Sequence, residues 1–490
     1  MPQLNPKKIE NIGVDGLIRP ASVDDNLIPE TAVTESINFH FDRVGATTVR
    51  GGMEGLGSTV LASRPCVGLH NAQSGTTLAV FSNGGSSTIY SFDGSVWSVS
   101  LDGGTASVRI RFIDFGSYTI AINFIYNTYS SMRYWNTGTS RHWHNTGNPI
   151  NVQNMWGRTP QVGEVYKNRI YLGGDTSVEG NPSRLYFSSV ISSTGRIAWD
   201  INTDYVDIYP GDGESITALK RFALELLVFK PNYIYRFRTS GGDPDPLIRV
   251  GTRSQESIIE GKKGLYFHHD SGFYKYSGGY PVEISRPISD IVSAIPYSQF
   301  EGIISWKDDD HIYWSVGNLT ITEAGLSETF KNVVVRYTES SEVWTVYSLS
   351  SDVRRGMIYT RGTTRSRVVG LDNGIVATFD SGTTDLGEPI KYRFRTKWYY
   401  TENIAERKVI NELVAICEKA QATEIMYQTD ENTEWKTIGQ LKKMVNFFDK
   451  LNIAFHRIRF KITGVSRFEA PIFRSIEIVK GANEGLIKNA

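Results

Sequence analysis

Short apolar runs recur at fairly even intervals through most of this chain. Most are followed by a second run, a tight turn and an aromatic or β-branched residue, as in residues 90–97. Asp-Gly, Asn-Gly and Gly-Gly pairs separate the runs, and such pairs supply the positive φ that hairpin turns need. The pattern therefore predicts small antiparallel sheets. The seven runs that show the repeat best are Leu78–Phe81, Ile120–Ile122, Arg169–Leu172, Leu226–Phe229, Leu265–Phe267, Ile312–Trp314 and Met357–Tyr359.

The repeat also predicts how these sheets are arranged. A sheet of three or four short strands cannot bury its own apolar face, so several must pack side by side. Repeats a few tens of residues long are typical of propellers and solenoids. We therefore predict an all-β chain in which residues 55–384 form a β-propeller of six to eight blades, with seven favoured. A string of ordinary β-sandwich domains is the competing interpretation.

The pattern differs at both ends of the chain. Residues 1–54 form an N-terminal segment that bears Pro and Asp. Strands are predicted in it at Ser36–Phe41 and Thr47–Arg50, and we expect these strands to close the ring. In residues 385–490 apolar positions alternate with charged ones, as in His456–Ile462. Such alternation is typical of a sheet that is buried on one face, so we predict a separate C-terminal β-sandwich.

One C-terminal segment fits two structures. The segment Ile404–Ala420 would make an amphipathic helix, with Val409, Leu413, Ile416 and Cys417 on its apolar face. We favour a strand instead, because the following run Glu424–Gln428 and the turn at residues 430–432 make a plausible hairpin.

Composition and charge narrow the class of protein. The chain has 490 residues, 12% of them aromatic, and 46 glycines, which suits a hairpin-rich protein with little helix. Its formal net charge is zero, so it has no overall basic field of the kind that dominates nonspecific nucleic-acid binding. Two cysteines, Cys66 and Cys417, cannot supply a disulfide framework. With neither a secretory signal nor a membrane-spanning stretch in the sequence, we expect synthesis in a reducing cytosol.

Few residue clusters suggest chemistry. His142 and His144 would share one face of a strand, and His268, His269 and Asp270 are adjacent, but neither group has a distant partner at a spacing typical of metal sites. The run Asp308–Asp310 lacks the spaced oxygens and the glycine of a calcium loop, so a solvated turn is favoured. We predict no catalytic, cofactor-binding or metal-binding residues.

The enzymatic alternatives rest on weak signals. The chain lacks both a phosphate-binding loop and a Gly-x-Ser-x-Gly elbow. A propeller glycan hydrolase needs paired carboxylates at a sugar cleft, and the chain has many acidic loops. Ser91–Trp97 is one residue short of the sialidase Asp-box, and a hairpin turn is the favoured interpretation. Trp143 and Trp156 would serve as sugar platforms in a hydrolase or adhesin, although aromatics in blades more often pack between sheets.

A resemblance extends over most of the chain. It lies in the order of strands, not in a catalytic motif. The segments that carry it are Arg50–Leu56, Ile216–Phe222 leading into Leu226–Phe229 and Asn232–Phe237, and Ile458–Gly464. In the order and spacing of these segments the sequence resembles the packaged-DNA-stabilisation and tail-nozzle proteins of short-tailed bacteriophages.

The resemblance implies a structural role in a virion tail. Proteins of this family form a ring, usually of six copies, that extends and gates the DNA channel below the portal and adaptor until ejection. The expected partners are other copies of the chain, the adaptor or head-completion proteins, tail fibres or spikes, and duplex DNA in transit. Synthesis would take place in the host cytoplasm, and no enzymatic activity is implied. The acidic stretch Val23–Asn26 and the loop Gly317–Lys331 depart from the family pattern. A glycan hydrolase or depolymerase and a carbohydrate-binding or protein-binding adhesin remain the alternatives.

Overall fold

The protein is built almost entirely from antiparallel strands. Where the chain is described, one short α-helix is present, α1 (Ser289–Ser293), as the scarcity of helix-forming patterns predicts. No helix among these residues is long and apolar enough to cross a membrane. The computed structural model describes residues 7–43, 45–57, 61–72, 75–83, 85–116, 118–125, 132–136, 143–144, 155, 157–190, 197–237, 244–323, 325–400 and 407–484.

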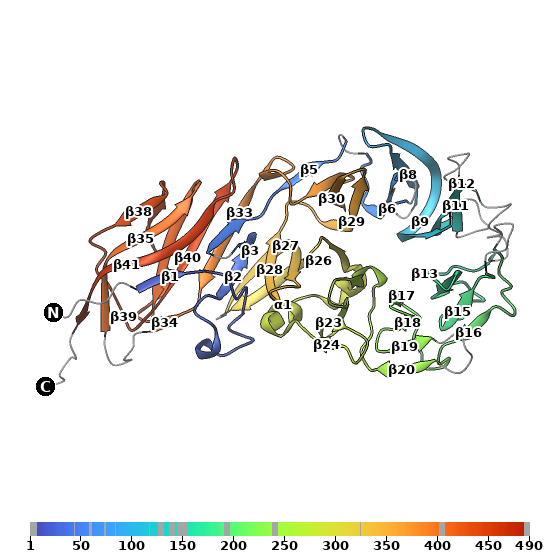
Figure 1. Cartoon of the computed structure of the whole chain (residues 1–490), viewed down its shortest axis with the longest axis horizontal. Coiled ribbons are helices and arrows are strands. Elements are labelled where there is room, and N and C mark those ends of the chain that lie inside the picture. The colour runs from blue at the N-terminus through green and yellow to red at the C-terminus, as the bar shows by residue number, and fades with distance from the viewer. Residues whose placement is uncertain are drawn as a thin grey trace.

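Four sheets of four strands each follow one another around part of a ring (Figure 1). In each sheet the strands pair in chain order, so each strand lies beside the one that follows it along the chain. The first two sheets are β13 (Val162–Tyr166), β14 (Arg169–Gly173), β15 (Arg184–Phe187) and β16 (Tyr205–Asp207), then β17 (Ala218–Phe222), β18 (Glu225–Phe229), β19 (Ile234–Phe237) and β20 (Asp245–Ile248). The other two are β21 (Ile259–Glu260), β22 (Leu265–His269), β23 (Gly272–Tyr276) and β24 (Val282–Glu283), then β25 (Ile304–Lys307), β26 (His311–Glu323), β27 (Leu326–Thr338) and β28 (Val343–Ser348).

A seven-stranded sheet and part of a larger sheet complete this ring. Strand β9 is 19 residues long and bends, so that its first half pairs with β8 and its second half with β10. Strand β29 lies beside both β6 and β25, which closes the circle. The seven-stranded sheet consists of β6 (Cys66–Asn71), β7 (Thr77–Ser82), β8 (Ser87–Phe92), β9 (Trp97–Phe115), β10 (Tyr118–Ile125), β11 (Met132–Asn136) and β12 (Trp143–His144). The part of the larger sheet consists of β29 (Val353–Arg361), β30 (Thr364–Leu371), β31 (Val376–Phe379) and β5 (Met53–Gly55).

The propeller arrangement is confirmed, but the predicted count of six to eight blades, with seven favoured, is wrong, because the arrangement has five. Five separate sheets belong wholly to the ring, four of four strands and one of seven. The predicted number was a count of hairpin units along the sequence. Two successive units form one sheet in the structure, because β9 pairs with β8 in one unit and with β10 in the next. The unit β29–β31 is not separate either, because β5 and β32 (Thr384–Asp385) link it to the C-terminal strands in a sheet of eleven.

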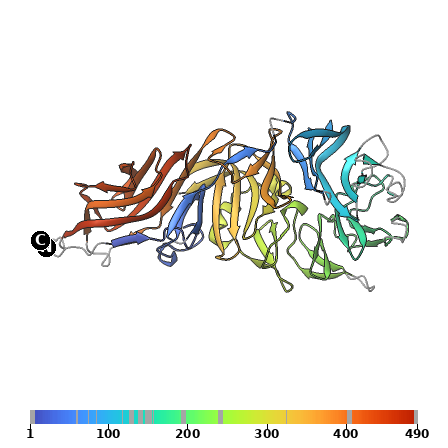
Figure 2. The ribbon, with the colours of Figure 1, turned by 45° about the horizontal axis from the view of Figure 1, so that its top comes forward.

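The C-terminal strands form two sheets at the other end of the elongated molecule (Figure 2). The segment 407–418 is a strand, as favoured over a helix, and the hairpin after it is confirmed. The first sheet, which continues from β32, contains β33 (Glu388–Thr396), β40 (Arg457–Ser466), β36 (Thr423–Thr429), β37 (Asn432–Leu441), β2 (Val33–Ile37) and β34 (Tyr399–Tyr400). The second contains β3 (Phe39–Arg43), β4 (Ala46–Val49), β41 (Ile472–Glu484), β35 (Arg407–Glu418), β38 (Val445–Phe448), β1 (Lys7–Glu10) and β39 (Ile453–Phe455).

The N-terminal strands pair mainly with these C-terminal strands. Strand β2 pairs with β33, while β1 and β4 pair with β41. Of the described strands β1 to β5, only β5 pairs with a blade strand, β31. The expectation that Ser36–Phe41 and Thr47–Arg50 close the ring was therefore wrong for these strands, because they pair with one another and with β33 and β41, not with a blade strand. The domain boundaries at residues 54 and 384 stay predictions.

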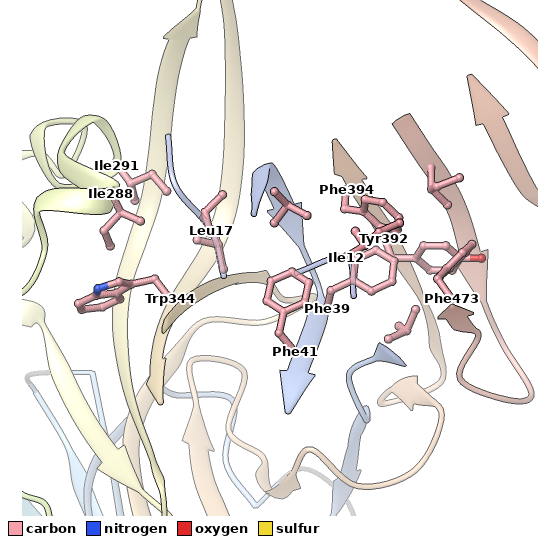
Figure 3. Close-up of a cluster of buried hydrophobic side chains, with 14 of the residues drawn as sticks. Ile12, Leu17, Phe39, Phe41, Ile288, Ile291, Trp344, Tyr392, Phe394 and Phe473 are labelled. Atoms are coloured by element: carbon pink, nitrogen blue, oxygen red, sulfur yellow. The ribbon is translucent and has the colours of Figure 1, made fainter. Parts of the chain in front are cut away.

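One continuous hydrophobic core joins the propeller to the C-terminal sheets. Leu17 and Phe41 lie between Trp344 of the propeller and the rings from the C-terminal strands (Figure 3). The Phe39 ring centroid is 5.2 Å from that of Phe394 and 5.8 Å from that of Phe473. Edge-on ring packing of this kind adds about 0.5 to 1.5 kcal/mol per pair beyond the buried area. The N-terminal segment thus fills the space between the two parts of the molecule.

Candidate functional site at the domain junction

The histidine clusters found in the sequence do not assemble a site. His268 is buried between the rings of Phe273 and Phe300, at centroid distances of 5.1 and 4.9 Å, and this burial lowers its pKa to about 3. His269 Nδ1 lies 3.1 Å from the Gly251 carbonyl oxygen, and Asp270 accepts hydrogen bonds from Arg253. No group of three or more possible metal ligands occurs in the described part of the chain.

Most of the other residues that the sequence suggested for a site lie outside the described part of the chain. His142 and Trp156 lie outside the described residues, as do the side chains of Trp143 and His144. The turn within Ser91–Trp97 is described, and Asp93 accepts hydrogen bonds from the backbone N–H groups of Ser95 and Val96. It is thus a hydrogen-bonded hairpin turn, in agreement with the favoured interpretation.

Asp308 differs from the solvated turn residue that the sequence favours. Its carboxylate accepts hydrogen bonds from Arg367 at 2.6 Å and from the Tyr313 hydroxyl at 3.2 Å, and it lies 2.8 Å from His311 Nδ1. Its neighbour Asp309 pairs with Arg365. The sequence shows three acidic residues but not the cations that distant strands bring to them.

These groups belong to a charge network between the propeller and β3. Asp42 accepts hydrogen bonds from Arg336, at 2.5 and 2.6 Å. His311 Nε2 lies 3.3 Å from Asp42, and His40 lies 3.1 Å from Asp42 and 3.2 Å from Asp380. The network therefore connects β3 to β26, β27 and the loop after β31.

The network shifts the pKa values of its members. Burial alone would raise the pKa of Asp42, but hydrogen bonds with His311 and His40 and the charge of Arg336 outweigh it, so the pKa lies well below its usual range. Burial alone would lower the pKa of His311, but its contacts with Asp308 and Asp42 raise it above 6.5. His311 thus lies between two carboxylates that favour its protonated form.

A second, fully buried ion pair lies at the same junction. Arg50 donates from its two terminal nitrogens to the two carboxylate oxygens of Asp385, at 2.8 and 2.5 Å. Its Nε donates to Asn38 Oδ1 at 2.8 Å, and the Arg50 side chain has no exposed surface. Such a two-point contact fixes both the distance and the orientation of the groups it joins. It ties the end of β4 to β32.

The loop noted at Gly317–Lys331 is a hairpin extension of the propeller. We call residues 317–331 the arm; it consists of the distal ends of β26 and β27, which pair through Leu319 and Phe330. Both strands have 13 residues, whereas β25 has four and β28 six, so the arm projects beyond the sheet.

The arm is held to the C-terminal strands by charge. Glu323 accepts hydrogen bonds from Arg395 at 2.7 and 2.9 Å and from Arg19 at 3.2 Å. Glu328 pairs with Arg393, whose guanidinium lies 5.3 Å from the Phe330 ring centroid. The arm therefore acts as a brace between the two parts of the molecule. Sequence reasoning missed it because the charged partners come from strands that are distant along the chain.

A cavity of about 510 Å³ lies between the arm and the sheet of β33 and β40. Its arm side is mainly apolar, with Leu319, Ile321 and Phe330, whereas its sheet side is charged. The charged lining consists of Arg19, Arg393, Arg395, Arg459 and Lys461, with Glu35, Glu323 and Glu328. Cations outnumber carboxylates here, so the cavity is suited to an anionic group.

Comparisons with known proteins identify no family. No family profile matches the chain, and no curated protein matches it. Among solved structures, the chain is similar to the extracellular domain of a candidate one-component system from B. thetaiotaomicron, with 12% identity, a TM-score of 0.41, and coverage of 67% of this chain and 40% of that one. It is also similar to virginiamycin B lyase from Staphylococcus aureus, with 12% identity, a TM-score of 0.39, and coverage of 66% and 97%.

A third similar structure is YCF48 from Cyanidioschyzon merolae, with 11% identity, a TM-score of 0.39, and coverage of 67% of this chain and 98% of that one. The chain spans less than half the length of that B. thetaiotaomicron structure and of a second one from the same organism, the extracellular domain of a candidate hybrid two-component system. At these scores the likenesses give no argument about activity.

Proposed function

We propose that this protein is a structural component of a short-tailed phage tail, a ring-forming nozzle or tail-tube subunit that extends and gates the DNA channel. The proposal originates in the order of strand segments along the sequence. One observation on the structure supports it: the N-terminal strands pair with strands of both the propeller and the C-terminal sheets. No reaction is part of the proposal.

A channel subunit has to keep its shape under load. Strand pairing, the buried pair Arg50–Asp385 and the braced arm all resist hinge motion between the two parts. Inter-domain interfaces without such contacts usually permit relative motion. The junction is therefore what a subunit would need if it transmitted force around a ring.

The same reasoning extends to the fold. We infer that the two C-terminal sheets form a β-sandwich, because rings from both, Phe394 of β33 and Phe473 of β41, pack against each other at 5.5 Å. Such a domain would present two opposite outer faces. A closed ring needs different surfaces that meet head to tail at each junction, and two distinct domains provide them.

The mass of the purified protein tests this proposal. Light scattering across a concentration series, with negative-stain electron microscopy of any large species, should show closed rings of one copy number with a hole wide enough for duplex DNA. The measurement should be repeated with adaptor rings, since such subunits often assemble only on the head. A protein that stays monomeric in both conditions, or that releases sugar from an envelope polysaccharide, would contradict the proposal.

A further inference from the structure

Three cations and two tryptophans, all partly exposed, form a ladder on one face of the C-terminal sheet. Arg457, Arg459 and Lys461 occupy alternate positions of β40, so their side chains leave the same face of the sheet. The guanidinium carbons of Arg457 and Arg459 lie 4.6 and 4.3 Å from the Trp398 ring centroid. The Arg459 guanidinium carbon and the Lys461 ammonium nitrogen lie 5.3 and 5.2 Å from the Trp435 ring centroid. We call these five residues the ladder.

The spacing of the strand explains this alternation. Residues two apart on an extended strand are about 6.8 Å apart, which leaves room for an aromatic ring between two side chains at van der Waals distance. Each indole therefore has two cations over it. Stacked in this way, an Arg side chain is fixed in direction while the N–H groups on its edge remain able to donate.

The ladder cations have no carboxylate partner within ion-pair distance among the described residues. Nearby carboxylates are already taken, since Glu323 pairs with Arg395 and Glu35 with Arg393. Arg459 donates from Nε to Gln428 Oε1 at 2.8 Å, which uses one of its five N–H groups. Burial lowers the pKa of Arg459 to about 10, and the neighbouring charge of Arg395 acts in the same direction. Glu35, Glu323 and Asp25 still act on Arg459 from a distance, but no ion pair ties the three ladder cations among the described residues, so this strip is locally basic in a chain of zero net charge.

We propose that the ladder binds an extended acidic peptide segment of a partner protein, with carboxylates at alternate positions. The argument is charge complementarity combined with spacing: side chains two apart in an extended peptide repeat at the same distance of about 6.8 Å as the ladder cations. Guanidinium edges match carboxylates in a two-point geometry. The apolar arm side of the adjoining cavity, with Ile321 and Phe330, would receive an apolar residue next to the acidic run.

Single-stranded nucleic acid is the other polyanion that basic and aromatic surfaces bind. Such binding draws on bases that stack on open aromatic faces. In the ladder each indole already has two of the chain's own cations over it, which leaves little ring surface for a base. The geometry thus favours carboxylates over bases. This inference is independent of the proposed tail function, and it would stand if that function failed.

Fluorescence anisotropy with the full-length protein tests the inference. The probe is a labelled peptide in which Glu alternates with Thr, compared with a peptide of the same composition that has all its glutamates in one block. We expect the alternating peptide to bind several-fold more tightly, with an affinity that falls as salt is raised. Equal binding of the two peptides, or tighter binding of an oligo-dT strand, would overturn the proposal.

Charge variants complete the test. Replacement of all three cations by Gln (R457Q, R459Q and K461Q) should weaken binding about tenfold or more, because each charge-assisted contact is lost. The matched control removes three exposed charges elsewhere (R286Q, K442Q and K443Q) and should leave binding nearly unchanged. The single variant Arg457→Gln, at the end of the ladder, guards against misfolding of the triple variant and should weaken binding several-fold. Unchanged binding in both ladder variants would refute the assignment.

Discussion

At the scale of single residues, the junction depends on charges that strands distant in sequence bring together. Arg50 and Asp385 are 335 positions apart, and both side chains are almost fully buried. A buried pair of this kind adds little compared with a well-packed apolar pair, but the loss of one partner leaves the other charged and without compensation. The sequence alone could not reveal the pair, since no local pattern links two residues so far apart along the chain.

Replacement of Asp385 should therefore be costly. We expect Asp385→Asn to lower the free energy of unfolding by about 3 to 5 kcal/mol, because Arg50 would remain buried without an anion. Urea denaturation of the purified protein measures this. Glu10→Gln, which breaks the exposed pair with Lys8, is the control and should have little effect. If both variants lost the same free energy of unfolding, the burial of the Arg50–Asp385 pair would not explain the loss.

The raised pKa of His311 predicts how stability depends on pH. A group with a folded pKa above its unfolded value of 6.5 stabilises the fold fully below that pH, and this stabilisation is lost as pH rises through the folded pKa. We expect the free energy of unfolding to fall over this range, and the variant His311→Gln to lack that part of the decline. Denaturation curves at a series of pH values test this. A decline of the same size in the variant would assign it to other groups.

At the scale of elements, most strands could be predicted and most of their long-range partners could not. Apolar runs and turn dipeptides located β7, β14, β18 and β22 because hairpin pairing is local. The pairing of β2 with β33 joins the N-terminal segment to the C-terminal strands across the whole propeller sequence, and no periodicity encodes it. The ladder residues were visible as the charged half of an alternating strand, but their grouping with Trp398 and Trp435 depends on neighbouring strands.

Strand β5 illustrates how tightly such long-range pairing can pack. A Cβ atom on Gly52, the residue before this strand, would lie 1.9 Å from the backbone carbonyl oxygen of Thr384, which cannot move without the sheet moving. We expect Gly52→Ala to destabilise the protein by about 1 to 3 kcal/mol or more, through overpacking. Gly55→Ala, at the other end of the strand, meets no atom within 4 Å and should be tolerated. Thermal unfolding of the two variants, side by side, measures the difference.

At the scale of the whole molecule, the sequence suggested separable domains whereas the structure has a shared core. The change of pattern after residue 385 is real, since apolar and charged residues alternate there. It could not show that Leu17 and Phe41 fill the space between the two parts, because a single buried residue leaves no periodic signal. We therefore expect the propeller and the C-terminal sheets to unfold together.

Calorimetry checks this expectation. A single transition with equal calorimetric and van't Hoff enthalpies would indicate one cooperative unit. Leu17→Ala at the junction and Leu78→Ala in a distant propeller sheet, both buried, should each lower the midpoint of that same transition, at a cost of about 2 to 5 kcal/mol. Two separate transitions, with only one shifted by Leu78→Ala, would contradict the expectation.

The pairing of β1 and β4 with β41 sets the order in which the nascent chain is completed. These N-terminal strands leave the ribosome first, yet β41 begins only at Ile472. At typical synthesis rates of about 5 to 20 residues per second, they wait roughly 20 to 90 s for their partner. Until β41 is made, the apolar residues of β1 and β4 that pack against it stay uncovered, so this part of the junction forms late and the uncovered residues favour aggregation during that interval.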